Sequence, residues 1–258
     1  MRNIRFYAAA FAAALSFATC AFAAEVHVMI SGGLNSAYEA LVPEYEQRTG
    51  NKVVTVRGPS MGDTPQAIPN RIARGEPVDV VIMVGDALSA LAAAGKVVAE
   101  SRVDIANSGI AMAVKAGEAR PDISTLEKFT QVLLDAKSVA YSDSASGVYL
   151  QNTLFPRLGI AEEMRRKSRM IPAEPVGGVV ARGEAQYGFQ QMSELRAVKG
   201  IDIVGPLPEG AQKLTLFSAA IANGAREPGA AKALVDFLRS DRGSAEIEKA
   251  GLLPLAAR

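Results

Sequence analysis

The sequence predicts an α/β fold built from two lobes. Short runs of β-branched and other apolar residues alternate with segments of helical spacing along most of the chain. Such alternation is typical of parallel strands covered by helices. No low-complexity linker interrupts it, whereas domains that follow one another in series are usually joined by one. We therefore expect two α/β lobes, with the chain crossing between them more than once.

The first third of the chain repeats a strand–helix unit. Residues 35–49 have helical spacing, because Ala37, Leu41 and Tyr45 fall on one face and Gly50 then stops the helix. The other elements expected here are strands at 26–30, 52–56 and 78–84 and helices at 64–74 and 87–94. This order favours parallel pairing of the strands.

The middle and the tail of the chain continue the pattern. Ser124 and Glu127 have the spacing of a capping box, which opens a helix that ends near Ala136. Further strands are expected at 109–115, 138–141, 187–191, 201–204 and 214–221, and further helices at 147–158, 176–182, 229–240 and 244–250. The alternation therefore extends almost to the end of the chain.

Composition excludes several classes of function. The 28 Lys and Arg residues balance 27 Asp and Glu residues, so no basic excess favours nucleic acid as a partner. The chain has one Cys and one His, which excludes a zinc site of the Cys/His type and an intrachain disulfide. A Ser-His-Asp site would have to use His27, and no partner for it is visible. We expect neither a metal nor a cofactor.

Residues 1–23 have the features of a secretory signal peptide. Arg2 and Arg5 supply the positive start, residues 6–18 are apolar, and an A-x-A site predicts cleavage after Ala23. A membrane anchor is the alternative, but the apolar run is short for a bilayer span. We therefore expect the mature protein in the periplasm or outside the cell.

Four segments resemble one known family when taken in order. They are HVMISGGLNSAYEALVPEYEQRTGNKVV, RGEPVDVVIMVG, SVAYSDSASGVYLQNTLFPRLGI and ARGEAQYGFQQMSEL. They resemble the molybdate-binding-protein-like branch of the type II periplasmic solute-binding proteins. The resemblance implies a first lobe of residues 24–107 plus 208–258, a second lobe of residues 108–207, and a ligand cleft between them. It also implies a monomer that binds a small anionic ligand and serves an ABC permease in the inner membrane.

Ser31, Gly32 and Gly33 are the first candidate ligand-binding residues. They lie between a predicted strand and a predicted helix, where free backbone N–H groups attract anions and glycine allows close approach. The alternative is an ordinary strand–helix turn. Molybdate binders in the family carry a serine at the position of Gly33, so this chain departs from their pattern.

Arg57 and Ser60 lie in a second candidate loop, and Arg71 follows on the next predicted helix. Molybdate relatives have a serine-rich run in this loop and hold their anion with neutral donors. A guanidinium instead offers two parallel hydrogen bonds to a planar carboxylate. The loop therefore favours a di- or tricarboxylate over molybdate, although any one arginine can be a solvated surface charge.

The second lobe supplies four more candidates. Ser146 and Gly147 open a predicted helix, where they can seat an anion or simply cap the helix. Gln190 and Gln191 end a predicted strand, where molybdate relatives have a tyrosine at the position of Gln191. Two amides offer both donors and acceptors, which suits an organic ligand better than a bare oxyanion, unless they form only a solvated strand end.

Binding is the first interpretation of the function, and catalysis is the alternative. The same branch resembles periplasmic aconitate isomerase, which implies movement of an allylic proton in a tricarboxylate without any cofactor. Such an enzyme needs clamps for carboxylates and one acid–base group. Asp143 and Tyr149 are the candidates for that group, although nothing in the sequence marks either one as perturbed.

Overall fold

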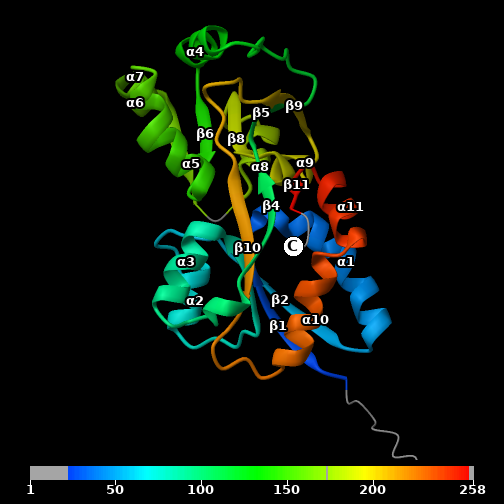
Figure 1. The fold of residues 1–258 in the computed structure, drawn as a ribbon. Helices are drawn as coiled ribbons and strands as arrows, with labels where there is room; N and C mark the ends of the chain where they lie inside the picture. The colour runs from blue at the N-terminus through cyan, green and yellow to red at the C-terminus, as the bar shows by residue number, and fades with distance from the viewer. Residues whose placement is uncertain (1–22, 173, 256–258) are drawn as a thin grey trace, which may run out of the picture.

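The computed structural model describes residues 23–172 and 174–255. The predicted signal peptide, apart from Ala23, lies outside these described residues. Within them, no helix combines the length and the apolar character needed to cross a membrane. The described residues form two β-sheets, each with helices packed against it (Figure 1). The predicted two-lobed α/β fold is therefore confirmed.

The first sheet has six strands in the described residues, in the order β11-β4-β10-β3-β1-β2. Their bounds are β1 Glu25–Ile30, β2 Lys52–Arg57, β3 Val80–Val84, β4 Val103–Ser108, β10 Thr215–Ile221 and β11 Leu253–Pro254. Strand β1 pairs in parallel with both β2 and β3. Strand β10 then joins β3 in the antiparallel sense and also pairs with β4.

The second sheet has five strands in the same part of the structure, in the order β7-β6-β8-β5-β9. Their bounds are β5 Ile110–Lys115, β6 Val139–Ser142, β7 Ser168–Ile171, β8 Tyr187–Gln191 and β9 Ile201–Pro206. Here β6 pairs in parallel with β7 and β8, and β5 joins β8 in the antiparallel sense. Both sheets thus contain three parallel strands followed by one antiparallel strand.

The chain passes between the two sheets at two places. Strand β4 of the first sheet ends at Ser108, and β5 of the second sheet begins at Ile110. Strand β9 of the second sheet ends at Pro206, and residues 207–214 lead back to β10 (Figure 1). Two adjacent passages of this kind are the geometry of a hinge.

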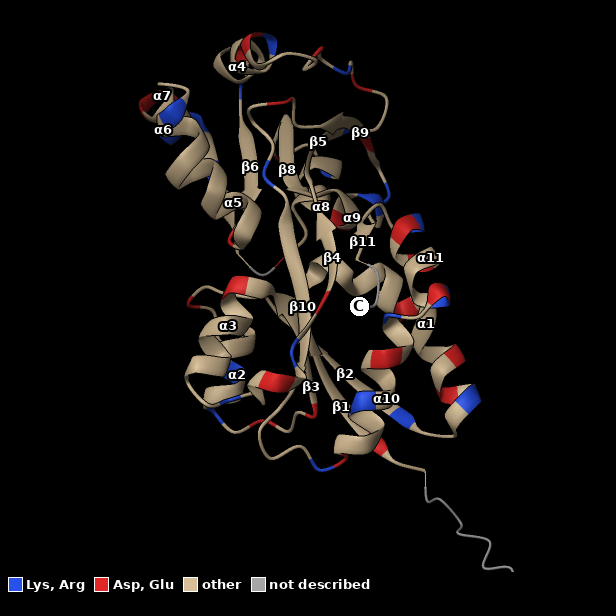
Figure 2. Cartoon of the chain, in the orientation of Figure 1, with Lys and Arg blue, Asp and Glu red and all other residues tan. Residues whose placement is uncertain are grey.

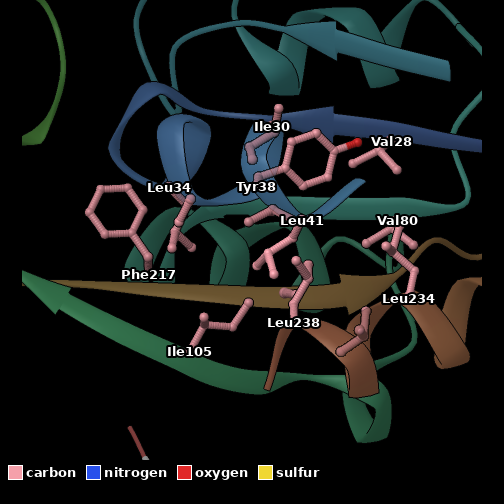
Figure 3. Close-up of a cluster of buried hydrophobic side chains, with 14 of the residues drawn as sticks. Val28, Ile30, Leu34, Tyr38, Leu41, Val80, Ile105, Phe217, Leu234 and Leu238 are labelled. Atoms are coloured by element: carbon pink, nitrogen blue, oxygen red, sulfur yellow. The ribbon is translucent and has the colours of Figure 1, made fainter. Parts of the chain in front are cut away.

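Helices cover both faces of the first sheet. On one face lie α1 Gly32–Thr49, α10 Pro228–Leu238 and α11 Asp241–Lys249, and on the other lie α2 Ile68–Ala73 and α3 Gly85–Ala93, with a 3₁₀ turn at Ala99–Ser101. The first face holds the larger core, in which Leu34, Tyr38 and Leu41 of α1 pack beside Ile30 and Phe217 of the sheet (Figure 3). The spacing of the α1 residues puts them on one side of the helix, so burial of this stripe stabilises the helix against the sheet.

The second sheet is also covered on both faces. Its helices are α4 Leu126–Asp135, α5 Ala145–Tyr149, α6 Phe155–Arg157, α7 Ala161–Lys167, α8 Val176–Ala181 and α9 Met192–Arg196. Phe129 of α4 packs edge-on against Phe189 of β8, with the ring centroids 6.0 Å apart. Val176 and Val180 of α8 belong to a separate buried cluster. The two clusters together stabilise the packing of these helices against the second sheet.

Several predicted elements differ from the observed ones. The helix expected from residue 64 starts only at Ile68, and Pro69 lies in its first turn, where proline is tolerated because the N–H that it lacks would have no helical partner. The helix expected at 147–158 starts at Ala145 and contains a π-helical turn, Leu150–Leu154. Helix α4 is capped by Thr125, whose hydroxyl accepts a hydrogen bond from Lys128, rather than by Ser124. The sequence prediction lacked six short elements: β4, β7, α7, α9, β11 and the 3₁₀ turn at Ala99–Ser101.

Charged residues are mixed in sign on the outer helices. Basic and acidic residues occur together on both α1 and α11 (Figure 2). Arg242 of α11, for example, donates to Glu44 of α1 at 2.9 Å and to Glu246 at 2.6 Å. The outer helices therefore present paired charges rather than a face of a single sign.

Candidate functional site

A cavity of about 440 Å³ lies between residues of the two lobes. Its lining comes largely from the carboxyl ends of the parallel strands in both sheets. In the first lobe these are Ser31 after β1, Arg57 at the end of β2 and Val84 at the end of β3, and in the second they are Ser142 of β6, Pro175 after β7 and Gln191 of β8. Ligands in open α/β sheets bind beyond these ends, because helix starts and uncommitted backbone groups meet there.

The start of helix α1 forms one wall of the cavity. Ser31 is its N-cap residue and has extended backbone, with φ of −93° and ψ of 160°. The Ser31 hydroxyl is buried and has no hydrogen-bond partner among the described residues. Gly32 and Gly33 follow and also line the cavity. This wall therefore combines the positive end of an 18-residue helix with an uncommitted hydroxyl.

Glu194 of α9 approaches this wall from the second lobe. Its Oε1 atom lies so close to Gly32 that a β-carbon at that position would overlap it. Burial raises the pKa of Glu194 to about 7. Hydrogen bonds from the Gln190 side chain and the Gln191 main chain oppose this shift, and the charge of Asp143 adds to it. Glu194 is therefore a carboxyl group that changes its protonation near neutral pH.

Helix α9 is fastened to the first lobe beside Glu194. The buried Ser193 hydroxyl donates to the Gly33 carbonyl oxygen at 2.6 Å. On the outer side, Arg196 donates to the Lys249 carbonyl oxygen at 3.4 Å. These contacts hold the carboxyl group of Glu194 at the start of α1.

Gln190 and Gln191 both line the cavity, and each is partly committed. The Gln190 amide oxygen accepts a hydrogen bond from the Val176 N–H at 2.9 Å. The Gln191 amide nitrogen donates to the Thr215 hydroxyl at 2.9 Å, while its buried oxygen has no partner in the described structure. The pair therefore offers the cavity one uncommitted acceptor and one amide group that faces Glu194.

Arg57 stands at the edge of the cavity. It donates to the Asn35 side chain at 2.8 Å and also pairs with Glu39, both on α1. The side chain remains 56% exposed. A ligand carboxylate that reached Arg57 would therefore share the guanidinium with Glu39.

Ser146 lines the cavity, whereas Gly147 lies behind it. The Ser146 hydroxyl is buried and hydrogen bonds to that of Ser142 at 2.9 Å. A β-carbon at Gly147 would overlap the Ser142 carbonyl oxygen and touch the ring of Tyr141. Glycine at position 147 is thus required by the close approach of β6 to α5.

Besides Gly147, four of the residues singled out from the sequence lie outside the cavity lining. The Ser60 hydroxyl is fully buried and accepts a hydrogen bond from the Val84 N–H at 3.0 Å. Arg71 pairs with Glu76 at 2.8 Å. The buried Tyr149 hydroxyl donates to the Ala211 carbonyl oxygen at 3.0 Å. His27 lies within β1 and hydrogen bonds to Glu25 at 3.1 Å.

The remaining lining residues make the cavity partly acidic. Asp143 and Glu174 of the second lobe line it together with Glu194. Glu174 is exposed and pairs with Arg182 at 3.2 Å. Asp143 also borders a second hollow, which it shares with residues 61–64 of the first lobe.

Sequence reasoning missed Glu194 because it missed helix α9. The predicted strand ended at Gln191, and the five residues that follow are too few for a helical period to show. One feature could have indicated it: Glu194 follows the carboxyl end of a strand, as Ser31 and Asp143 do. That common position marks the side of an α/β sheet where ligands bind.

The chain is similar to known proteins over nearly all of its length. It is 56% identical over 231 residues to the aconitate isomerase of a Pseudomonas species, a match that covers 90% of this chain and 88% of that protein. It is 27% identical over 248 residues to the molybdate-binding protein ModA of Azotobacter vinelandii, covering 91% and 92% of the two chains.

The solved structures show the same fold. The periplasmic molybdate-binding protein of Azotobacter vinelandii matches with a TM-score of 0.69 at 20% identity, over 90% of this chain and 100% of that one. The resemblance predicted from the sequence is thereby confirmed. Residues 26–253 match the model of one family, and the chain belongs to that family, the bacterial extracellular solute-binding proteins.

Proposed function

We propose that this protein is an isomerase that interconverts trans- and cis-aconitate. The observation that carries the proposal is the cavity of about 440 Å³, which holds two buried polar atoms that have no hydrogen-bond partner among the described residues, Ser31 Oγ and Gln191 Oε1. A cavity of this size suits a small organic molecule. The 56% identity to an aconitate isomerase supports the same assignment.

The cavity has groups suited to carboxylates. The start of α1 favours a negative charge, and the Ser31 hydroxyl can donate to it. Arg57 can pair with a second carboxylate at the edge. A tricarboxylate would extend from this edge toward Ser146 and Gln190 of the second lobe, which also line the cavity.

The reaction class requires only proton transfer. Aconitate has a methylene group next to its double bond, and loss of a proton from that carbon gives an anion delocalised over three carbons. Return of the proton to the former vinylic carbon moves the double bond by one position. The new double bond keeps the rotamer in which the old single bond was held, so a site that fixes this rotamer determines whether the product is cis or trans. Donors near the carboxylates stabilise the charge as it develops.

The proposal is tested by incubating the purified protein with trans-aconitate and following cis-aconitate by proton NMR. We expect cis-aconitate to appear until both isomers reach equilibrium, and the same equilibrium to be reached from cis-aconitate. Calorimetric titration with molybdate and with citrate is the companion measurement. Tight molybdate binding, with no turnover of trans-aconitate and no calorimetric response to citrate, would contradict the proposal.

Solute binding for a transporter is the second candidate, and membership in the solute-binding family favours it. In that function the cavity would hold a di- or tricarboxylate and deliver it to an ABC permease after export to the periplasm. Both functions predict binding, so turnover separates them. Binding of trans-aconitate with no cis-aconitate formed would support the transport function.

A further inference from the structure

The proposed reaction needs a base that can reach a carbon-bound proton inside the cavity. Three carboxyl groups line the cavity in the described residues: Asp143, Glu174 and Glu194. Glu174 is exposed and already paired with Arg182. Asp143 lies where the cavity meets the second hollow. Glu194 is the carboxyl group that lies against Gly32 at the start of α1.

Contacts from both lobes fix the position of Glu194. The residue before it, Ser193, hydrogen bonds to Gly33 across the lobes at 2.6 Å, and the residue after it, Leu195, is fully buried. The Gln190 amide oxygen is held by the Val176 N–H, so the amide nitrogen is left for Glu194. A base held in this way needs little reorganisation before it acts.

Glu194 lies beside the start of α1, where a substrate carboxylate would bind. Ser31 Oγ is buried at the start of α1, and no described residue hydrogen bonds to it. A carboxylate that accepts its hydrogen bond would place the adjacent carbon beside Glu194, whose Oε1 lies against Gly32. The acidic methylene protons of aconitate are on a carbon adjacent to a carboxylate.

We propose that Glu194 is the general base of this reaction, taking the proton from the methylene carbon and returning it to the vinylic carbon. This inference rests on the proposed function. In the first half, the carbon–hydrogen bond breaks, its electron pair joins the allylic system, and the proton moves to a Glu194 oxygen. In the second half, the proton forms a bond with the far carbon, and Glu194 is again a carboxylate. No oxidant, reductant or other reactant is consumed.

The surroundings of Glu194 suit this task. Burial raises the pKa of Glu194 to about 7, and the charge of Asp143 contributes to this rise. The hydrogen bonds from the Gln190 side chain and the Gln191 main chain act in the opposite direction. A base whose pKa lies near the working pH is ionised in a large fraction of molecules and remains strong enough to take a proton. The start of α1 faces it from the other lobe.

The experiment compares the wild type with Glu194→Gln in three measurements: isomerisation, deuterium uptake by aconitate in D₂O, and calorimetric binding of trans-aconitate. For the variant we expect isomerisation and deuterium uptake to fall together by about 10³-fold. Binding should be no weaker than in the wild type, because one negative charge is removed from the cavity. Glu209→Gln is the matched control, an exposed carboxyl group outside the cavity, and it should behave as the wild type.

The outcomes separate this inference from the function on which it rests. A wild type without isomerisation refutes the proposed function and this inference together. An active wild type with an equally active Glu194→Gln variant refutes only the assignment of the base. Loss of activity in Asp143→Asn with normal rates in Glu194→Gln assigns the base to Asp143 instead. If Glu194→Gln does not fold, Glu194→Asp is expected to keep a reduced kcat and an acidic limb in its pH profile, and a wild-type kcat there would refute the inference.

Discussion

Arg57 is conspicuous in the sequence, but its contribution to ligand binding depends on the residues that already pair with it. The sequence predicts it as a clamp for a carboxylate, and the structure places it at the edge of the cavity. There it already pairs with Glu39 and Asn35 of α1. The free energy that Arg57 contributes to binding is therefore the difference between its interaction with a ligand and its interaction with Glu39.

Replacing Arg57 with alanine should weaken binding of trans-aconitate by about 1.5 kcal/mol. This is the lower end of the range for a hydrogen bond to a charged group, because Glu39 competes for the guanidinium. Calorimetric titration measures the change. Arg74→Ala is the control, since Arg74 pairs with Glu76 away from the cavity, and it should leave the affinity unchanged. An Arg57→Ala variant with wild-type affinity would remove Arg57 from the site.

Glu194 should make the free energy of unfolding depend on pH. Its pKa is raised from 4.5 to about 7 in the folded protein, so the folded state favours the protonated form. The stabilisation of the folded state by protonated Glu194 is therefore fully present below about pH 4.5, and it is lost as the pH rises through 7.

Glu194→Gln should remove this dependence and stabilise the ligand-free protein at pH 8 by about 1–3 kcal/mol relative to the wild type. Urea unfolding of both proteins between pH 5 and 8 measures the effect. Glu209→Gln, the exposed control, should follow the wild type. Parallel pH profiles for the wild type and Glu194→Gln would contradict an elevated pKa at this residue.

At the scale of elements, the structure separates two residues that the sequence treats as one site. Ser146 and Gly147 lie in the first turn of helix α5, and the sequence suggests that both seat a ligand anion. Only Ser146 lines the cavity. Gly147 meets the main chain of Ser142 behind it. Substitutions at the two residues should therefore have different consequences, one for ligand binding and the other for stability.

Ser146→Ala should lower ligand affinity by about 0.5–1.5 kcal/mol, because it removes one neutral hydrogen bond. Gly147→Ala should instead lower the melting temperature, since the added methyl group overlaps the Ser142 carbonyl oxygen. Melting temperature and affinity measured on both variants test the distinction. Lost stability with unchanged affinity in Ser146→Ala would show that Ser146 supports only the helix.

Helix α9 is the element that the sequence could not provide. Its five residues are too short for a period to appear, and its position comes from the Ser193 bond to Gly33 of the first lobe. Strands β4 and β11 likewise form because of their pairing with neighbouring strands. Their sequences carry little strand pattern, and they become strands because β10 and β4 offer free edges.

At the scale of the whole molecule, one side chain connects the two passages between the lobes. The Gln212 amide accepts a hydrogen bond from the Ile110 N–H at 2.8 Å and donates to the Ile110 carbonyl oxygen at 2.9 Å. Gln212 belongs to the returning segment 207–214, and Ile110 begins the outgoing strand β5. The pair therefore fastens the two passages at the hinge.

Gln212→Ala should lower the free energy of unfolding by about 1–3 kcal/mol, since it leaves two main-chain groups of Ile110 with fewer partners. It should also increase proteolytic cleavage within residues 207–214 in the ligand-free protein. Gln131→Ala is the control, because the Gln131 side chain hydrogen bonds to Asp135 on the surface of α4, away from the passages between the lobes. Equal stability and cleavage in the two variants would show that the hinge does not depend on Gln212.

The fold class, most of the longer elements and the loops that contribute to the cavity can be predicted from the order of the residues alone. These follow from local patterns: helical spacing from Ala37 to Tyr45, apolar runs such as β3, and glycine or serine after strands. Strand ends of parallel sheets gather on one side, so the residues that follow β1 and β6 could be expected to lie near a common site.

Which side chains enter that site depends on how the two lobes pack together. The following contacts come from that packing. It placed Glu194 from the second lobe against Gly32 of the first, and it turned Tyr149 toward Ala211 rather than into the cavity. It also created the pKa shift of Glu194, whose main cause is burial. Contacts between residues far apart in the chain and the exclusion of water depend on how the two lobes meet, and no local pattern of residues encodes them.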